Sequence, residues 1–237
     1  MANRKNNAAS VETRRRLIDA AGEVFAERGF AQATIRDITQ RANTSIASVN
    51  YHFREKTELY NAVMELLESD MRGVMPPESV LTGGPAEQLR AFVRHFLSEI
   101  LQCDEQPEWM QVLWARELAS PSPAMKSLID KVIRPVNDRL TAILRQLAPA
   151  PLSREQELLQ TSSIMGQMLY FVCHQPVVAH LYPDVPHVGA PQSADLIADH
   201  IVRFSLAALA CKDPPARVTQ PRKSASTRRG AAKSGGR

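Results

Sequence analysis

The sequence lacks the features that define several large classes of protein. It has three cysteines in 237 residues, widely spaced and without a CxxC pair, which argues against a disulfide framework or a zinc finger. No run approaches the roughly 18 apolar residues of a membrane-spanning helix, and the first residues lack the apolar core of a signal peptide. We therefore expect a cytoplasmic protein with no membrane partner and with buried free thiols.

Motifs of common enzyme chemistry are missing as well. No GxGxxG, GxxxxGK[ST] or GxSxG pattern occurs, so no motif in the sequence supports a nucleotide-driven or hydrolase function. The stretch CHQPVVAHLYPDVPH (173–187) groups Cys, His and Asp, as a metal or catalytic site would. Its spacings match no standard ligand pattern, and its three prolines break the helix there. We predict that the protein is not an enzyme and holds no metal and no cofactor.

Alternating strand patterns are also absent, and apolar residues recur at helical spacing along most of the chain. Leu17, Ala21, Val24 and Phe25 mark one face of a first helix that Gly29 would end. A capping box at Ser153 and Gln156 and breaks at Pro135 and Pro176 are expected in the later helices. These helices are predicted over 55–75, from Pro85 onward, and over 106–119, 122–147, 153–182 and 193–211. The fold is therefore predicted to be all-α.

Two further short helices are predicted directly after the first. Thr34 and Asp37 form a T-x-x-D capping signature that starts the second helix. The chain turns at Asn43-Thr44, where Asn tolerates a left-handed conformation, and Ser45 can cap the third helix. The inward face of this third helix is predicted to consist of its apolar residues, Ile46 or Ala47 with Val49 and Phe53.

The third helix presents flat polar side chains together. Asn50 can form two hydrogen bonds to an adenine edge, Ser48 can bond to several base edges, and Tyr51 and His52 can donate to phosphates. Two short helices joined by a tight turn, the second one capped and in basic surroundings, are typical of a helix-turn-helix that enters the major groove of DNA. The same pattern also fits a half-exposed face of an ordinary helical bundle.

Charge is distributed unevenly along the chain. Ten Lys and Arg against six Asp and Glu give residues 1–56 a net charge of +4, eleven against eighteen give residues 57–211 −7, and eight against one give residues 212–237 +7. This pattern indicates a head that binds a polyanion, a body with another task and a basic tail. The tail is rich in Pro, Gly and Ser, so we expect it to be disordered.

The run ETRRRLIDAAGEVFAERGFAQATIRDITQRANTSIASVNYHFREKTELY (12–60) resembles the N-terminal domain of the TetR family of transcriptional regulators. It contains the R-x-x-L/I-x-x-A-A-x-x-x-F-x-x-x-G-F start, the T-x-x-D-I capping run and the closing Y-H-F-x-x-K-x-x-L. The residues A-S-V-N-Y-H-F and the large C-terminal body also resemble the CecR-type branch of this family. The resemblance implies a DNA-binding regulator.

The family's contacts, carried onto this chain, imply a set of DNA-binding residues. Arg36 would be a base contact, Lys56 would hold a phosphate, and Ser45 would cap the reading helix. The chain departs from the family at Asn43-Thr44, Ile46 and Asn50, which leaves open which bases are read. The candidate DNA-binding residues are Thr34, Arg36, Ser45, Ile46, Ala47, Ser48, Asn50, Tyr51, His52 and Lys56.

The chain is predicted to comprise four regions. These are a flexible N-terminus (1–10), a helix-turn-helix DNA-binding domain (11–56), a helical effector-binding and dimerisation domain (57–211) and a disordered basic tail (212–237). The resemblance implies a homodimer formed through the last two long helices. Large and adaptable side chains in the body favour an apolar effector pocket. Its candidate residues are Phe92, His95, Phe96, Trp109, Met110, Trp114, Met165, Met168, Tyr170, Phe171 and His174.

The resulting hypothesis is a ligand-responsive regulator, most simply a repressor. It would bind double-stranded DNA at a palindromic operator as a homodimer and be released by a small, mostly apolar effector. Two alternatives stay open at this point: a constitutive DNA-binding protein without an effector, and a helical enzyme or metal-binding module.

Overall fold

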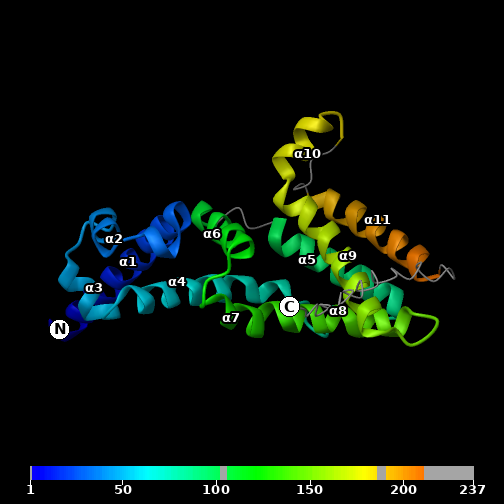
Figure 1. The fold of residues 1–237 in the computed structure, drawn as a ribbon, viewed down its shortest axis with the longest axis horizontal. Helices are drawn as coiled ribbons and strands as arrows, with labels where there is room; N and C mark the ends of the chain where they lie inside the picture. Colours follow the sequence, from blue (N-terminus) through cyan, green and yellow to red (C-terminus); the bar gives the residue numbers. More distant parts are fainter. Residues whose placement is uncertain (1, 102–105, 186–190, 211–237) are drawn as a thin grey trace, which may run out of the picture.

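The computed structural model describes residues 2–101, 106–185 and 191–210, and these residues form helices and no strand (Figure 1). The prediction of an all-α fold is confirmed. No described helix combines the length and the apolar character that crossing a bilayer requires. The elements are α1 (Ala2–Gln32), α2 (Ile35–Arg41), α3 (Ile46–Phe53), α4 (Lys56–Asp70), the 3-10 turn η1 (Met71–Val74), α5 (Pro85–Leu101), α6 (Glu108–Ala119), α7 (Met125–Leu128), the π-helical turn η2 (Ile129–Ile133), α8 (Arg134–Leu147), α9 (Arg154–Cys173), α10 (Gln175–Leu181) and α11 (Pro191–Ala210).

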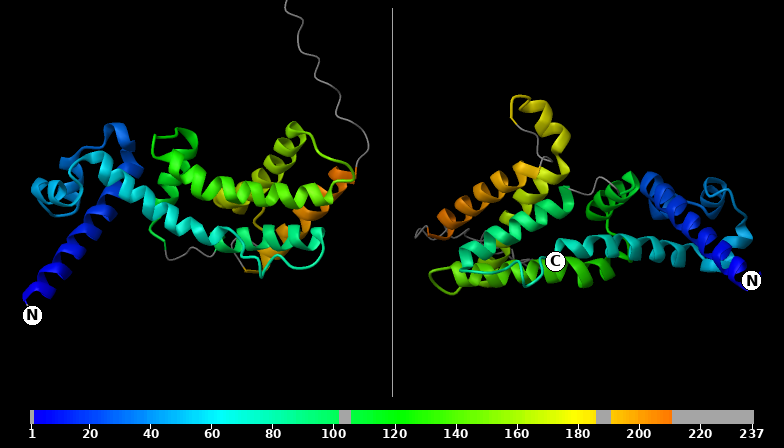
Figure 2. Two further views of the ribbon diagram at one scale, coloured as in Figure 1. Left: turned by 90° about the horizontal axis from the view of Figure 1, so that it is seen from below. Right: turned by 180° about the vertical axis from the view of Figure 1, so that it is seen from behind.

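The molecule is elongated, with its first three helices at one end (Figure 1). We call α1–α3 the head, α4 the connecting helix, and the elements from α5 onward the body. The connecting helix runs from the head along the long axis toward the body, and α10 stands out from the rest of the body (Figures 1 and 2). The basic tail, together with Cys103, Cys211 and His187, lies outside the described residues. Cys173 is exposed, so the expected burial of this thiol is wrong.

Local side-chain interactions start the helices where the sequence predicted them. Thr34 and Asp37 form the predicted capping box of α2, and Ser153 and Gln156 form that of α9. The Ser45 side chain accepts a hydrogen bond from the backbone N–H of residue 48 and thereby caps α3. Each of these caps satisfies N–H groups that have no partner inside the helix.

Several helix boundaries differ from the predicted ones. Gly29 takes non-helical dihedrals (φ 75°, ψ 164°), but one more turn follows it, to Gln32. α1 also includes residues 2–10, because no Gly or Pro before Gly22 ends the helix. The predicted helix over 122–147 contains the π-helical turn η2, which ends just before Pro135, a residue without an N–H to donate within the helix.

Buried apolar side chains form two clusters, and α6 joins the one that contains the head. The first cluster combines α1–α4 with α6, α7 and η2. The second cluster combines η1, α5, α8, α9 and α11. The body elements α6, α7 and η2 therefore share a core with the head and the connecting helix, a relationship that the sequence pattern does not reveal. The domain boundary predicted at residue 56 stays a prediction.

Candidate nucleic-acid interface

Helix α3 buries only a narrow stripe of its surface. Val49 and Phe53, one turn apart, are buried against the head, whereas Ile46 is 52% exposed and Ala47 is exposed as well. The predicted inward position of Ile46 or Ala47 is therefore wrong. The reason is the position of these two residues in the first turn of a short helix, beyond its contact with the helices beneath it.

The exposed side of α3 carries residues predicted to meet DNA. Helical spacing places Ile46, Ala47, Asn50 and Tyr51 on one face, all four are exposed, and the Tyr51 side chain is 79% exposed. The half-buried His52 ring lies edge-on to the Tyr51 ring, with centroids 4.9 Å apart. The structure thus brings polar, aromatic and small side chains together on an outer surface of the head.

The turn before α3 is held by three hydroxyl groups. Asn43 takes the predicted left-handed conformation, with a φ of 47°. Thr44 Oγ1 donates to Ser48 Oγ over 2.9 Å, and the hydroxyls of Ser45 and Ser48 lie 3.2 Å apart. Ser48 is half-buried in this small network, so its hydroxyl is positioned by the turn rather than free on the surface.

Basic side chains around α2 differ in how much they are engaged within the head. Arg28 pairs with Asp37 over 2.8 Å, and Arg41 pairs with Glu27 over 2.5 Å. Arg36 is exposed, and within the described part of the chain its guanidinium has no hydrogen bond or ion pair. Arg36 is therefore the arginine of α2 whose charge is available to a partner.

The hydroxyl of Thr34 is committed within the head. Thr34 Oγ1 donates its single proton to Asp37 Oδ2 over 2.7 Å and accepts from the Asp37 N–H. The hydrogen bond from Thr34 holds the pKa of Asp37 below its ordinary value, and the Arg28 charge adds to this effect. In this arrangement Thr34 has no hydroxyl proton left to donate to a phosphate, so that predicted contact requires the capping box to open.

Lys56 is also engaged within the head. Its ammonium group donates to the carbonyl oxygens of Phe30, over 2.8 Å, and Ala33, over 3.1 Å, and lies 4.5 Å from the centroid of the Phe30 ring. Two of its three donors therefore serve the end of α1. The start of α4 has no side-chain cap, so its first N–H groups are further donors at this place.

A strained turn between α3 and α4 has no signal in the sequence. Arg54 has a φ of 54°, which is unusual for a residue other than glycine, and the Glu55 N–H donates to the Phe53 carbonyl over 2.5 Å. This tight turn places the start of the connecting helix directly after α3.

The structure does not bring the predicted effector residues together. Trp109, Met110 and Trp114 belong to the cluster that contains the head, as partly or fully buried side chains. The other apolar members pack in the second cluster: Phe92, Phe96, Met165, Met168 and Phe171. His95 bonds to the Gly73 carbonyl over 2.8 Å, and the exposed Tyr170 stacks on His174. The predicted residues are divided between two separate cores, because helical spacing selects buried side chains of both, and the effector pocket stays a prediction.

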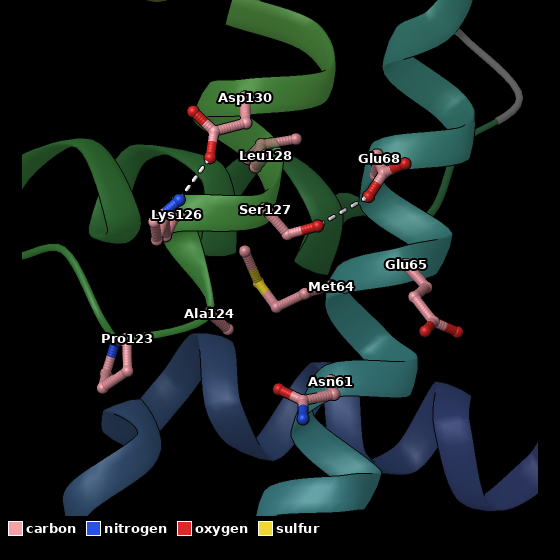
Figure 3. Close-up of a pocket in the computed structure, with 10 residues that line it drawn as sticks. All are labelled: Asn61, Met64, Glu65, Glu68, Pro123, Ala124, Lys126, Ser127, Leu128 and Asp130. Atoms are coloured by element: carbon pink, nitrogen blue, oxygen red, sulfur yellow. Dashed lines mark hydrogen bonds and ion pairs between the residues drawn. The ribbon is translucent and has the colours of Figure 1, made fainter.

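A cavity of about 480 Å³ lies instead between the connecting helix and α7 (Figure 3). Met64 points into it from α4, between Asn61 on one side and the Ser127 hydroxyl, which donates to Glu68, on the other. None of these residues belongs to a recognisable motif, so the sequence gives no indication of this cavity. The lining residues are Asn61, Met64, Glu65, Glu68, Pro123, Ala124, Lys126, Ser127, Leu128 and Asp130.

Two buried carboxylates, Glu68 and Glu117, are also not predictable from the sequence. Each is about 3% exposed and is held by donors from other elements. Their only signal in the sequence is an acidic residue among apolar positions of a helix, which is also the pattern of an ordinary exposed face.

A capped third helix with an exposed outer face, on a head joined to a larger helical body, is the arrangement of a helix-turn-helix regulator. Residues 17–63 match the family described as bacterial regulatory proteins, tetR family. Residues 85–209 match the C-terminal domain of HTH-type transcriptional dual regulator CecR. The chain therefore belongs to the TetR family of transcriptional regulators, with a C-terminal domain of the CecR type; it carries a DNA-binding domain and is not an enzyme.

Relatives with known names agree with this family. The chain is 22% identical over 173 residues to the HTH-type transcriptional regulator AcrR of Shigella flexneri, covering 70% of this chain and 80% of that one. It is 30% identical over 115 residues to the probable acrEF/envCD operon repressor of Escherichia coli (strain K12), covering 47% of this chain and 51%, about half, of that relative.

Solved structures share the fold. A bacterial regulatory protein of the tetR family from Rhodococcus RHA1 superposes with a TM-score of 0.57 at 20% identity, over 85% of this chain and 98% of that one. The TetR family regulator PfmR from Thermus thermophilus gives a TM-score of 0.55 at 19% identity, over 79% and 94% of the two chains. At these identities the likeness concerns the fold alone.

Proposed function

We propose that the protein is a homodimeric repressor that binds a palindromic operator in the cytoplasm and releases it when a small, mostly apolar effector binds to the body. The observation that carries this proposal is the outer face of α3, where Asn50 and Tyr51 are exposed beside Ile46 and Ala47. Such a face on a capped helix suits the major groove.

The proposed contacts divide into two kinds. Asn50 and Arg36 read base edges, because each can make two parallel hydrogen bonds to one base, and Ile46 offers apolar contact to a thymine methyl group. Tyr51, His52 and the start of α4 with Lys56 hold phosphates and set the register. Ser48 reads a base edge after a small rotation of its hydroxyl.

The proposed dimer uses the exposed sides of α9 and α11. On α9, Leu158 is 64% exposed, and a Cβ added at Gly166 would meet no neighbouring atom within 4 Å, which leaves room for the close approach of another helix. On α11, Phe204 is 56% exposed, whereas Ile197 and Ile201 are buried in the chain's own core. Exposed apolar side chains on two adjacent long helices favour a four-helix interface across a two-fold axis.

The proposed effector site is the part of the predicted set that packs together in the second cluster, on α5 and α9. Phe92, Phe96 and Met168 are fully or almost fully buried there, so an effector must displace side chains as it enters. Methionine and aromatic side chains can repack in this way. Binding would shift the body against the connecting helix and change the distance between the two heads.

The tight packing of these same side chains also favours the alternative of a constitutive DNA-binding protein without an effector. A broad panel of apolar compounds separates the two. An effector raises the melting temperature and weakens operator binding, whereas a panel that changes neither supports the constitutive binder.

DNA reading is tested on the fragment that the purified protein enriches from genomic DNA. Asn50→Ala and Arg36→Ala should each cost roughly 1–3 kcal/mol per half-site on that fragment and leave binding to random DNA nearly unchanged. Asn137→Ala and Arg139→Ala, on α8 of the body, are the matched controls. An unchanged ratio of specific to random affinity in both head variants, with the fold intact, rejects the assignment.

A further inference from the structure

Helix α6 holds the head through the side chain of Arg116. Its Nε donates to the Ala26 carbonyl over 3.1 Å and its Nη2 donates to the Glu27 carbonyl over 3.0 Å. These oxygens lie in the last regular turn of α1, just before Gly29. A cation that bonds to the last carbonyls of a helix also interacts favourably with the helix dipole. Arg116 thus fixes α6 to α1 in direction as well as in distance.

Gly29 allows this approach. Its φ of 75° belongs to the region that favours glycine, and a Cβ at this position would lie 2.9 Å from Nη1 of Arg116. The absence of a side chain at Gly29 therefore allows the positive φ near the end of α1 and leaves room for the Arg116 guanidinium beside it.

The next residue, Glu117, holds the connecting helix. Its carboxylate is buried, accepts a short hydrogen bond from the Tyr60 hydroxyl, and accepts from the N–H and the hydroxyl of Ser122 over 3.0 and 2.9 Å. Burial and the hydrogen bond to Glu117 raise the pKa of Tyr60 above its ordinary value, so the phenol keeps its proton. The Tyr60 ring also packs edge-on against Phe25 of α1, with centroids 4.7 Å apart.

Two neighbouring residues of α6, Arg116 and Glu117, therefore form hydrogen bonds to α1 and α4, the helices that pack beside α3 in the first cluster. Arg116 holds α1, which lies beneath the reading helix, and Glu117 holds α4, which follows it in the chain. Apolar surfaces tolerate sliding, whereas hydrogen bonds from a guanidinium to two backbone carbonyl oxygens, and from a hydroxyl to a buried carboxylate, favour one orientation.

We propose that Arg116 and Glu117 are positioning residues that fix the orientation of the head on the body and thereby set the spacing between half-sites that the dimer accepts. The inference rests on the proposed dimer and adds the residues that determine its spacing. If the two heads of a dimer are held rigidly on the body, they bind both half-sites well only when the distance between the half-sites matches the distance between the heads. Heads that are held loosely accept several distances, but with a lower affinity for the best one.

The test uses the full chain and a DNA library in which two copies of the enriched half-site are separated by a variable number of base pairs. Arg116→Met keeps the side-chain stem and removes the donors, and Tyr60→Phe keeps the ring and removes the hydroxyl that Glu117 accepts. Arg139→Met and Tyr182→Phe are matched controls on parts of the body remote from α6. Each protein is first checked for its helical signal, and its affinity for a single half-site is measured separately.

In the wild type and in both controls we expect one favoured spacing. In Arg116→Met and Tyr60→Phe, the preference for that spacing over one changed by two base pairs should fall about tenfold. Their affinity for a single half-site should stay within about twofold of the wild type, because the outer face of α3 is unchanged. If Arg116→Met does not fold, Tyr60→Phe decides the result.

Two outcomes overturn the inference. If the two variants lose stability but keep the wild-type spacing profile, Arg116 and Glu117 only stabilise the fold, and the proposed function stands. If the wild type binds single half-sites but favours no distance between two of them, the orientation of the head on the body does not determine the accepted half-site spacing. Failure of the wild type to bind DNA at all would instead reject the proposed function, and this inference with it.

Discussion

The indole ring of Trp109 on α6 packs directly against Gly22 on α1. A Cβ at Gly22 would lie 2.6 Å from three atoms of that ring, well inside van der Waals contact. The close approach of these two helices therefore requires glycine at position 22, and Trp109 belongs to the contact between head and body.

We predict that Gly22→Ala destabilises the protein even though alanine favours helices. The overlap with Trp109 should lower the free energy of unfolding by about 1–3 kcal/mol, measured by urea denaturation. Trp109→Phe provides the control, because a smaller ring leaves room for the added methyl group. In that background Gly22→Ala should cost much less, and an equal cost in both backgrounds would show that the ring is not the cause.

Lys56→Met should affect both stability and DNA binding. The carbonyls of Phe30 and Ala33 lose their donor, which should lower the free energy of unfolding by about 1–3 kcal/mol. If the remaining donor holds a phosphate as proposed, the dependence of random-DNA affinity on salt should weaken by about one ion per head. A salt dependence equal to that of the wild type, with lower stability, would assign Lys56 to the end of α1 alone.

The buried Glu68 should make the stability depend on acid pH. Burial alone would raise its pKa, but hydrogen bonds from Lys131 and Arg72 more than offset this effect and hold the pKa below 4.5. A carboxyl group with a lowered pKa in the folded state stabilises the fold above its unfolded pKa, and this stabilisation disappears as the pH falls through the folded pKa. The free energy of unfolding should therefore decrease as the pH falls below about 4.5.

Glu68→Gln should remove part of this dependence. At neutral pH it should lower the free energy of unfolding by about 1–3 kcal/mol, because Lys131, Arg72 and Ser127 lose a charged acceptor. Glu65→Gln is the matched control, since Glu65 is exposed on the same helix. Urea denaturation from neutral to acid pH tests this prediction, and equal curves for the two variants would contradict it.

If the protein is the proposed dimer, a charged side chain placed in the interface should lower its mass in solution. Leu158→Glu and Phe204→Glu place a carboxylate within the proposed interface and should each convert the dimer to single chains at micromolar concentration. Val112→Glu, at a 45% exposed apolar residue on α6, should leave the dimer intact. Light scattering measures the mass, and a wild type with the mass of one chain would contradict the proposed dimer.

Interactions between residues close in the chain were predictable from the sequence. The caps at Thr34, Ser45 and Ser153 and the left-handed Asn43 each depend on the residue itself and on partners within a few positions. The all-α fold and the reading helix follow from the same local signals together with helical periodicity.

Partners far apart in the sequence were decided only by the tertiary structure. Arg116 bonds to a carbonyl ninety residues away, and Lys56 serves the end of a helix that ends twenty-four residues before it, so neither role leaves a local pattern. Periodicity selects apolar positions but does not say which surface covers them. Ile201 and Phe204 therefore look alike in the sequence, although one lies in the core of the chain and the other is exposed. For the same reason the sequence favours Trp109 as a lining residue of an effector pocket, whereas the packing of α6 places it against the head.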